Sequence, residues 1–130
     1  GFRVARRAKV FDCKFESDSI SAKHNGYNKI GIIHERSFKW NKNEILIKDH
    51  LSKSTKNKSI AFFHFHSRIE KPKVKFNSVI LNSDKVEMFF LGHTEIKVEE
   101  YYLCNGYNKT IISHKIIVKF DKELKTRIKI

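Results

Sequence analysis

The sequence predicts an all-β protein, an antiparallel β-sandwich of about nine or more strands in two sheets. Three observations predict this fold class. Apolar and polar residues alternate with a period of two along most of the chain, no segment keeps a convincing helical period, and turn-forming residues recur about every 8–12 residues. The 130 residues have the size of one domain, so residues 1–130 are expected to fold as a single β-sandwich domain.

The strands predicted in the first half rest on alternating side chains, which a strand sends to opposite faces. The segment 7–16 alternates around Val10 and Phe11. The segment 31–40 places five residues on one face: Ile32, His34, Arg36, Phe38 and Trp40. The segment 44–48 is short and apolar. In the segment 59–68 one face carries Ala61, Phe63 and Phe65, and the opposite face carries Phe62, His64 and His66.

The second half continues the pattern. The predicted strands there span 73–81, 85–91, 95–103, 109–120 and 123–130. The last of them alternates Leu124, Thr126 and Ile128 with cationic residues. Turn signals stand along the chain at Asn25-Gly26, 41–43, 82–84, Gly92 and Asn105-Gly106. The two Asn-Gly pairs are strong signals for hairpin turns.

The chain is strongly basic, with 27 Lys and Arg against 14 Asp and Glu and a net charge of +13. Such an excess favours an anionic partner: nucleic acid, anionic lipid or an acidic polysaccharide. Scattered lysines that only set solubility are the alternative. Three arginines crowd one end, Arg3, Arg6 and Arg7, and a guanidinium matches carboxylates and sulfates. The sequence has no stripe of interleaved basic and aromatic residues that would support nucleic-acid binding. No apolar run reaches the ~18 residues of a membrane span.

Two features bear on the wider context of the chain. It opens on Gly1 rather than Met, so it is expected to be a piece of a longer protein. Its two cysteines, Cys13 and Cys104, lie far apart and form no CxxC pair, which excludes a zinc knuckle or a thioredoxin-type motif. A disulfide across a sheet remains open, and two buried thiols are the favoured expectation.

Three histidine-bearing segments are candidate sites. His64 and His66 share a strand face and would suit a metal ion or an anion, or else a half-buried polar face. His34 and Arg36 would suit an anion, although Asp49 on the next strand would also pair with Arg36 across the sheet. The segment from His24 to Tyr27 is interpreted as a turn, with an acid–base pair as the alternative. No phosphate loop, nucleophile elbow or zincin motif is present.

Five segments, in this order, resemble the C-terminal region of heparinase II/III-like proteins. They are 1–8, His24 to Tyr27, His34 to Arg36, Ile47 to Asp49 and Phe63 to His66. The resemblance covers roughly residues 1–70, and the second half matches as further strands. It implies a polysaccharide lyase that cleaves uronate-containing glycans by β-elimination, with an N-terminal α/α toroid before a C-terminal β-sandwich. A periplasmic or cell-envelope location is expected for the parent protein.

The resemblance also implies roles for residues. The family's catalytic tyrosine and histidine lie largely on the toroid and at the very start of the sandwich, so no catalytic residue is expected in this chain. A possible structural zinc of the full-length protein would draw mainly on the region before Gly1, with His34 as its later histidine ligand and no aspartate where the carboxylate ligand is expected. Contacts to acidic polysaccharide, or to the toroid, are expected from Arg3, Arg6, Arg7, His34 and Arg36, since the intermediate gathers negative charge at the uronate carboxylate.

Two other functions remain open. A non-catalytic carbohydrate-binding module would use an exposed aromatic platform, for which Trp40, the one tryptophan, is the probe. A nucleic-acid binder is suggested only by charge and would bind with a steep salt dependence. It is placed last, and no nucleic-acid partner is expected.

Overall fold

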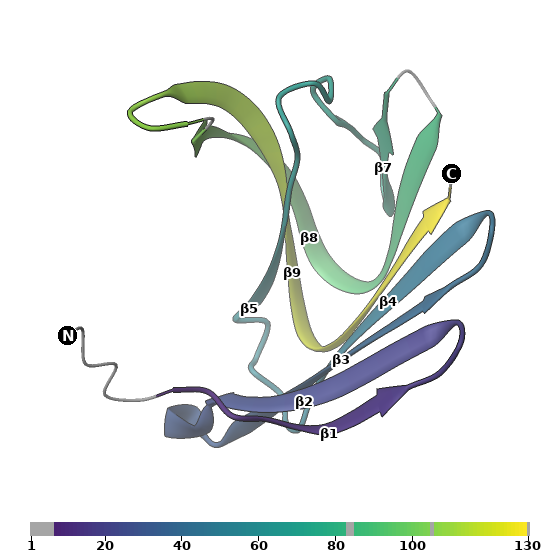
Figure 1. The fold of residues 1–130 in the computed structure, drawn as a ribbon, viewed down its shortest axis with the longest axis vertical. Helices are drawn as coiled ribbons and strands as arrows, with labels where there is room; N and C mark the ends of the chain where they lie inside the picture. The colour runs from purple at the N-terminus through teal and green to yellow at the C-terminus, as the bar shows by residue number, and fades with distance from the viewer. Residues whose placement is uncertain (1–6, 83–84, 105, 130) are drawn as a thin grey trace.

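The computed structural model describes residues 7–82, 85–104 and 106–129, which form an all-β fold (Figure 1). One short 3-10 helix, η1 (Asn28–Ile30), accompanies nine strands within the described residues. The strands are β1 (Val10–Phe15), β2 (Ser19–Tyr27), β3 (Ile32–Trp40), β4 (Glu44–Leu51), β5 (Ser59–His64), β6 (Lys73–Val74), β7 (Ser78–Leu81), β8 (Val86–Cys104) and β9 (Thr110–Lys129). The predicted all-β fold class is confirmed. No helix in the described ranges is long and apolar enough to cross a membrane.

The strands pair in the order β1-β2-β3-β4-β9-β8-β7-β6, and β5 pairs with β9; each of these pairings is antiparallel. The two longest strands connect the layers of this arrangement. The C-terminal part of β9, from Glu123 to Lys129, pairs with β4, whereas its earlier part, from Lys115 to Phe120, pairs with β5. Because β8 follows β9 along both parts, the sandwich is one bent sheet whose two layers share β8 and β9 (Figure 1).

Gly92 lies where β8 bends. Its φ is +89°, and a Cβ there would lie 2.4 Å from the carbonyl oxygen of Glu123. The pairing register of β8 with β9 shifts between Leu91 and His93, so the bend is a bulge that leaves the ladder intact on both sides. The prediction of a turn at Gly92 is therefore wrong. The segments predicted as 85–91 and 95–103 fall in the one strand β8 from Val86 on, and those predicted as 109–120 and 123–130 fall in β9, which spans Thr110–Lys129.

The strand β2 lies where no strand was predicted. It pairs with β1 on one side and with β3 on the other, and it runs through the Asn25-Gly26 pair that was interpreted as a hairpin turn. The chain reverses later, through η1 and Gly31, whose φ of +67° ends the 3-10 turn in the left-handed region. The hairpin signal failed because His24 pairs with both neighbouring strands and Asn25 exchanges hydrogen bonds with Lys9, just before β1. Such tertiary pairing overrides local turn preference.

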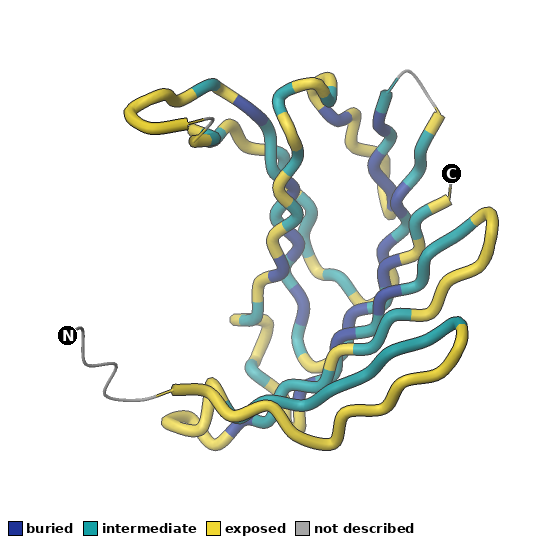
Figure 2. Tube along the Cα trace, in the orientation of Figure 1, coloured by how far each residue is buried: buried dark blue, intermediate teal, exposed yellow. Residues whose placement is uncertain are grey.

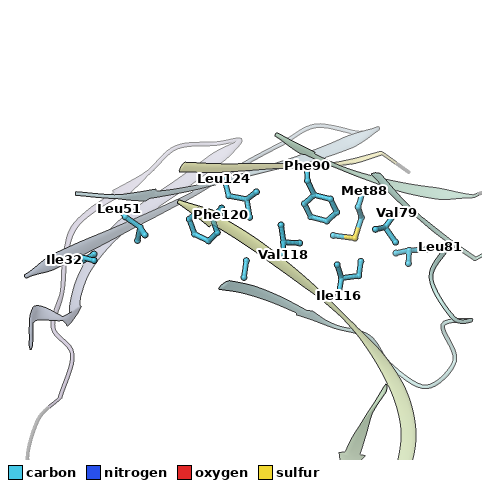
Figure 3. Packing of buried hydrophobic residues seen from close by; sticks show 11 residues of the cluster. Ile32, Leu51, Val79, Leu81, Met88, Phe90, Ile116, Val118, Phe120 and Leu124 are labelled. Carbon is cyan, nitrogen blue, oxygen red and sulfur yellow. The ribbon is translucent and has the colours of Figure 1, made fainter. Parts of the chain in front are cut away.

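The hydrophobic core packs between the two layers (Figures 2 and 3). Its buried members come from β3, β4, β5, β7, β8 and β9: Ile32, Leu51, Ala61, Val79, Leu81, Met88, Phe90, Ile116, Val118, Phe120 and Leu124. Each large aliphatic or aromatic side chain fully buried in this way contributes about 1.5–3 kcal/mol. Cys13 and Cys104 lie outside the core; both are exposed and free, so the expectation of buried thiols is wrong.

Candidate functional site

Four polar side chains gather on the inward face of β2, β3 and β4. The register places His24 opposite His34 and Arg36 opposite Asp49. Because His34 and Arg36 are two residues apart on β3, their side chains leave the strand on the same side. Residues directly opposite each other in an antiparallel pair lie on the same face of the sheet, so His24 and Asp49 lie on that face as well. The strand register therefore brings the four side chains together.

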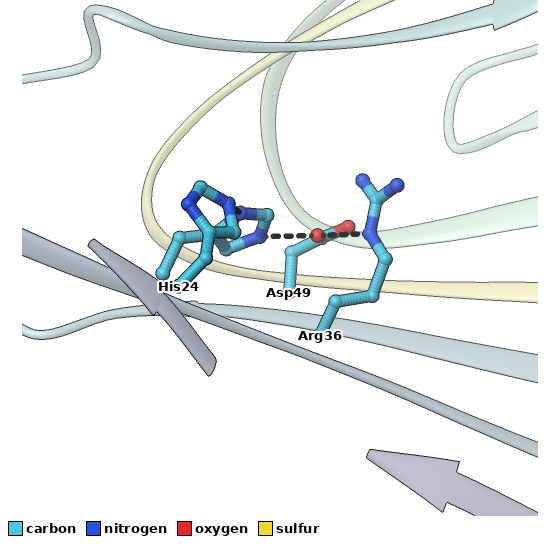
Figure 4. A network of polar contacts seen from close by, with 4 residues as sticks. His24, Arg36 and Asp49 are labelled. Atoms are coloured by element: carbon cyan, nitrogen blue, oxygen red, sulfur yellow. Dashed lines mark hydrogen bonds and ion pairs between the residues drawn. The ribbon is translucent and has the colours of Figure 1, made fainter. Parts of the chain in front are cut away.

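Asp49 is the centre of this cluster (Figure 4). Its Oδ1 lies 2.7 Å from His34 Nε2 and 2.7 Å from Arg36 Nε. The Asp49 side chain is 1% exposed, and its second oxygen, Oδ2, is a buried atom without a hydrogen-bond partner in the part of the chain that the structure describes. The predicted pairing of Arg36 with Asp49 across the sheet is confirmed.

The hydrogen bonds fix the tautomers of both histidines. The backbone N–H of Gly26 can only donate, and it points at His24 Nδ1 at 3.1 Å, so the proton of a neutral His24 is on Nε2. His24 Nε2 lies 2.9 Å from His34 Nδ1, which therefore accepts, and the proton of His34 is on Nε2 toward Asp49. The chain of bonds from Gly26 to Asp49 is complete with both imidazoles neutral and Asp49 ionised.

The electrostatics agree with that assignment. Burial acts to raise the pKa of Asp49, but the hydrogen bonds from His34 and Arg36, together with the Arg36 charge, outweigh it and lower that pKa below its ordinary value. Burial lowers the pKa of His24 most, and the electrostatic interactions with His34 and Arg36 lower it further. Asp49 is thus held as a carboxylate and His24 as a neutral ring.

Arg36 keeps the donors on both of its Nη atoms. Only Nε is engaged by Asp49, the side chain is 44% exposed, and Figure 4 shows the two Nη atoms directed away from the carboxylate. No other hydrogen bond or ion pair of Arg36 occurs among the described residues. A guanidinium fixed at Nε with free Nη donors is a pre-oriented fork for a carboxylate or sulfate.

A cavity of about 770 Å³ opens beside this cluster. It lies between the layers, bounded by β2, β3 and β4, the 52–58 loop, and β5 and β9. Its apolar floor includes Ile32, Leu51, Ala61 and Phe120, and its cations are Arg36, Lys53, Lys56 and Lys58. A smaller depression of about 290 Å³ on the opposite face of the sheet is lined by polar and charged residues that include the Glu123 ion pairs.

The predicted site residues have different outcomes. His34 and Arg36 come together and both line the cavity. Arg7 is exposed and is not among the cavity residues, and Arg3 and Arg6 lie outside the described residues. Whether any of these five contacts substrate stays a prediction.

The predicted metal ligand, His34, has both ring nitrogens engaged in hydrogen bonds, so it would bind a metal only after losing one of them. Within the described residues no group of three or more His, Cys, Asp or Glu side chains is arranged to hold a metal ion. The residues present therefore do not form a metal site by themselves, and the zinc role of His34 stays a prediction about the longer protein.

The other two histidine segments are arranged differently from the expectation. β5 ends at His64, so His66 does not continue the strand; its Nδ1 accepts the backbone N–H of Arg68 instead. The His64 ring packs edge-on against Tyr101 at 4.8 Å. The rings of His24 and Tyr27 lie 5.4 Å apart, but the Nε2 atom of His24 faces His34 and not Tyr27.

Three participants were missed by the sequence reasoning. The His24–His34 contact required β2, which was not predicted. The three lysines of the 52–58 loop were not predicted as site residues, although their cluster of positive charge was an available signal. Asp121 accepts hydrogen bonds from Ser54 Oγ and from the backbone N–H groups of Thr55 and Asn57, which fixes that loop from a distant part of the chain.

Fold and site define an all-β domain with a cationic cavity suited to an anionic ligand. The chain matches the family described as heparinase II/III-like, C-terminal, over residues 1–130, and it therefore belongs to that family. The predicted family is confirmed. Comparison with curated proteins returned no match.

Solved structures of two lyases share the fold. The heparan sulfate lyase HepC from Pedobacter heparinus is 13% identical with a TM-score of 0.68, covering 97% of this chain and 22% of that one. A heparinase III, the BT4657 gene product, is 14% identical with a TM-score of 0.60, covering 94% and 21%. The chain thus spans about a fifth of the length of these proteins.

Proposed function

We propose that the chain is the C-terminal β domain of a polysaccharide lyase that cleaves uronate-containing acidic glycans by β-elimination. The domain supports the substrate cleft, and the catalytic residues lie elsewhere in the longer protein. Family membership, the shared fold of two lyases and the net charge of +13 support this proposal.

One observation carries it: the Arg36 guanidinium is oriented by a buried carboxylate and faces the cavity with free donors. β-Elimination removes the proton on C5 of a uronate, and the resulting intermediate carries added negative charge at the carboxylate. A fixed guanidinium stabilises that charge without reorganising during the reaction. Its orientation depends on Asp49, which acts as a positioning residue.

The remaining contacts follow from this role. Arg3, Arg6, Arg7 and His34 would contact the glycan or an N-terminal α/α toroid of the same protein. A structural zinc, if the full-length protein holds one, would draw mainly on residues before Gly1. The acidic polysaccharide is the expected ligand of the assembled cleft.

The test compares residues 1–130 with the longer protein that includes the toroid. We expect the longer protein to convert heparan sulfate or alginate to products with the ultraviolet absorbance of an unsaturated uronate, and residues 1–130 alone to give no turnover. Arg36→Met in the longer protein is expected to lower turnover, while Lys39→Met, on the same strand and outside the cavity, leaves it unchanged. Turnover by residues 1–130 alone would contradict the proposal.

A second candidate function keeps one supporting observation. Trp40 is 40% exposed, as a carbohydrate-binding module with an aromatic platform requires. Titration of glycans against the fluorescence of Trp40 tests it: a shift with neutral and acidic glycans alike favours the module, and no shift with either removes it.

A further inference from the structure

We propose that the cavity between the layers is a sugar-acid subsite carried by this domain alone, in which the lysines of the 52–58 loop hold an anionic group of the ligand alongside Arg36. The proposal rests on the proposed function for its class of ligand. It adds a location, a set of binding residues and a way of binding that does not need the rest of the protein.

Charge is the first argument. Four cations line the cavity, Arg36, Lys53, Lys56 and Lys58, against one carboxylate, Asp49. Asp49 is already paired through Oδ1 with His34 and Arg36, and no ion pair of the three lysines occurs in the described parts of the chain. Uncompensated cations within one partly enclosed space raise the local concentration of an anion.

The loop that carries these lysines is held in place by hydrogen bonds. Three donors from the 52–58 loop converge on Asp121 Oδ1: Ser54 Oγ at 2.8 Å, the Thr55 N–H at 2.9 Å and the Asn57 N–H at 3.1 Å. Thr55 Oγ1 also donates to the Asp121 carbonyl oxygen at 2.8 Å. These bonds lower the pKa of Asp121, the N–H of Asn57 most strongly and then Ser54 Oγ, so the anchor stays ionised at neutral pH.

The backbone of the loop supports the same conclusion. Lys56 and Asn57 take consecutive left-handed φ values of +54° and +61°. A left-handed backbone is uncommon at a non-glycine residue such as Lys56, and it persists where surrounding bonds impose it. The bonds to Asp121 impose it here, and the result is that the cationic loop is pre-organised at the cavity mouth.

The walls of the cavity suit the apolar faces of a sugar ring. The cavity has an apolar floor, and Tyr27 and Phe62 line it while remaining 50% and 51% exposed. A pyranose presents C–H faces that pack on aromatic rings and polar groups at its edge. The cavity volume of about 770 Å³ lies in the range of small-molecule sites. An anionic sugar therefore matches both the floor and the rim.

Calorimetric titration of residues 1–130 tests the subsite, with two acidic oligosaccharides as probes, one carrying only carboxylates (from hyaluronan) and one also sulfated (from heparan sulfate). We expect at least one to bind, and a neutral cello-oligosaccharide not to bind. The variant Lys53→Gln/Lys56→Gln/Lys58→Gln is expected to weaken binding about tenfold. The matched control, Lys14→Gln/Lys42→Gln/Lys85→Gln, removes the same charge from exposed positions outside the cavity and should bind as the wild type.

Amide chemical-shift mapping of the wild type keeps the test independent of how the variants fold. Shifts in 52–62 and at Tyr27 support the subsite, whereas shifts confined to the opposite face, at Glu35 and His50, overturn it. Equal weakening by both triple variants also overturns it, because charge alone would then explain binding.

The subsite and the proposed function fail separately. If the longer protein cleaves acidic glycans but residues 1–130 bind none, the subsite is refuted and the proposed function stands. If residues 1–130 bind an acidic oligosaccharide at the cavity but the longer protein cleaves no acidic glycan, the subsite stands and the proposed function is refuted.

Discussion

Asp49 Oδ1 lies 2.7 Å from Arg36 Nε, while the second oxygen of the same carboxylate is buried without a partner in the described residues. The Asp49 side chain is 1% exposed. Among the described residues, Arg36 is its permanently charged partner, and His34 is its second hydrogen-bond partner. A buried charge that loses such a partner is strongly destabilising, because its desolvation is no longer offset.

The first prediction follows from this pair. We expect Arg36→Met to lower the free energy of unfolding by about 2 kcal/mol, less than for a fully buried pair because Arg36 is 44% exposed. Urea unfolding measures it. Lys39→Met is the matched control on the same strand, since the Lys39–Asp18 pair is exposed at 3.7 Å and should change stability by less than about 0.5 kcal/mol. Equal losses for the two variants would refute the prediction.

The histidine pair predicts a dependence on pH. The pKa of His24 in the fold lies below its ordinary value of 6.5, so the unfolded chain binds the proton more readily. The stabilisation from neutral His24 is present above pH 6.5 and is lost progressively as the pH falls below it, because burial first, and then the neighbouring His34 and Arg36, disfavours the protonated ring.

Thermal unfolding between neutral and mildly acidic pH checks this dependence. His24→Gln should flatten the decline relative to the wild type. His66→Gln, at an exposed histidine whose Nδ1 accepts a local backbone N–H, should retain the wild-type profile. A His24→Gln profile that declines as steeply as the wild type would show that another group is responsible.

Gly92→Ala tests the bend of β8. Its Cβ would lie 2.4 Å from a backbone oxygen, at a φ of +89°, so neither the side chain nor the backbone has an easy adjustment. We expect a loss of about 2 kcal/mol or more in chemical denaturation. Gly31→Asn is the control, because its Cβ would meet only the flexible end of Lys53 and Asn tolerates a φ of +67°. A Gly92→Ala protein as stable as Gly31→Asn would mean that the bend does not require glycine.

Asp121→Ala tests the anchor of the cationic loop. Removing the carboxylate releases the N–H groups of Thr55 and Asn57, so we expect faster hydrogen exchange at both amides. Exchange at Val118, in the buried core, should change little by comparison. Asp18→Ala, which removes an exposed carboxylate from the β1–β2 turn, is expected to leave the loop amides as they are in the wild type. Unchanged exchange in Asp121→Ala would show that the loop is ordered by other contacts.

Sequence reasoning identified the fold class and one contact of the site. Alternation with a period of two marks a strand wherever one face is buried, which is why the strand bearing Ile32, His34 and Arg36 was predicted within about a residue of its ends. The same strand order made Asp49 a neighbour of Arg36. These are properties of adjacent segments, and a sequence displays them directly.

What could not be predicted depends on distant segments. β2 carries few large apolar residues, and its burial is intermediate from Ser19 to Asn25, so it lacks a clear pattern. The bulge at Gly92 resembles a turn until the ladder with β9 is known. The loop and its anchor, Thr55 and Asp121, are 66 residues apart, and only the bend of β9 brings them together.

The sharing of β8 and β9 between the layers has a consequence for how the domain comes apart. Neither layer has a complete set of strands of its own, so neither can melt while the other persists, and we expect one cooperative transition. Assembly also depends on distant segments: β4 must pair with the C-terminal part of β9, across most of the chain, before the larger layer closes. Such non-local pairing places the domain among slowly folding proteins.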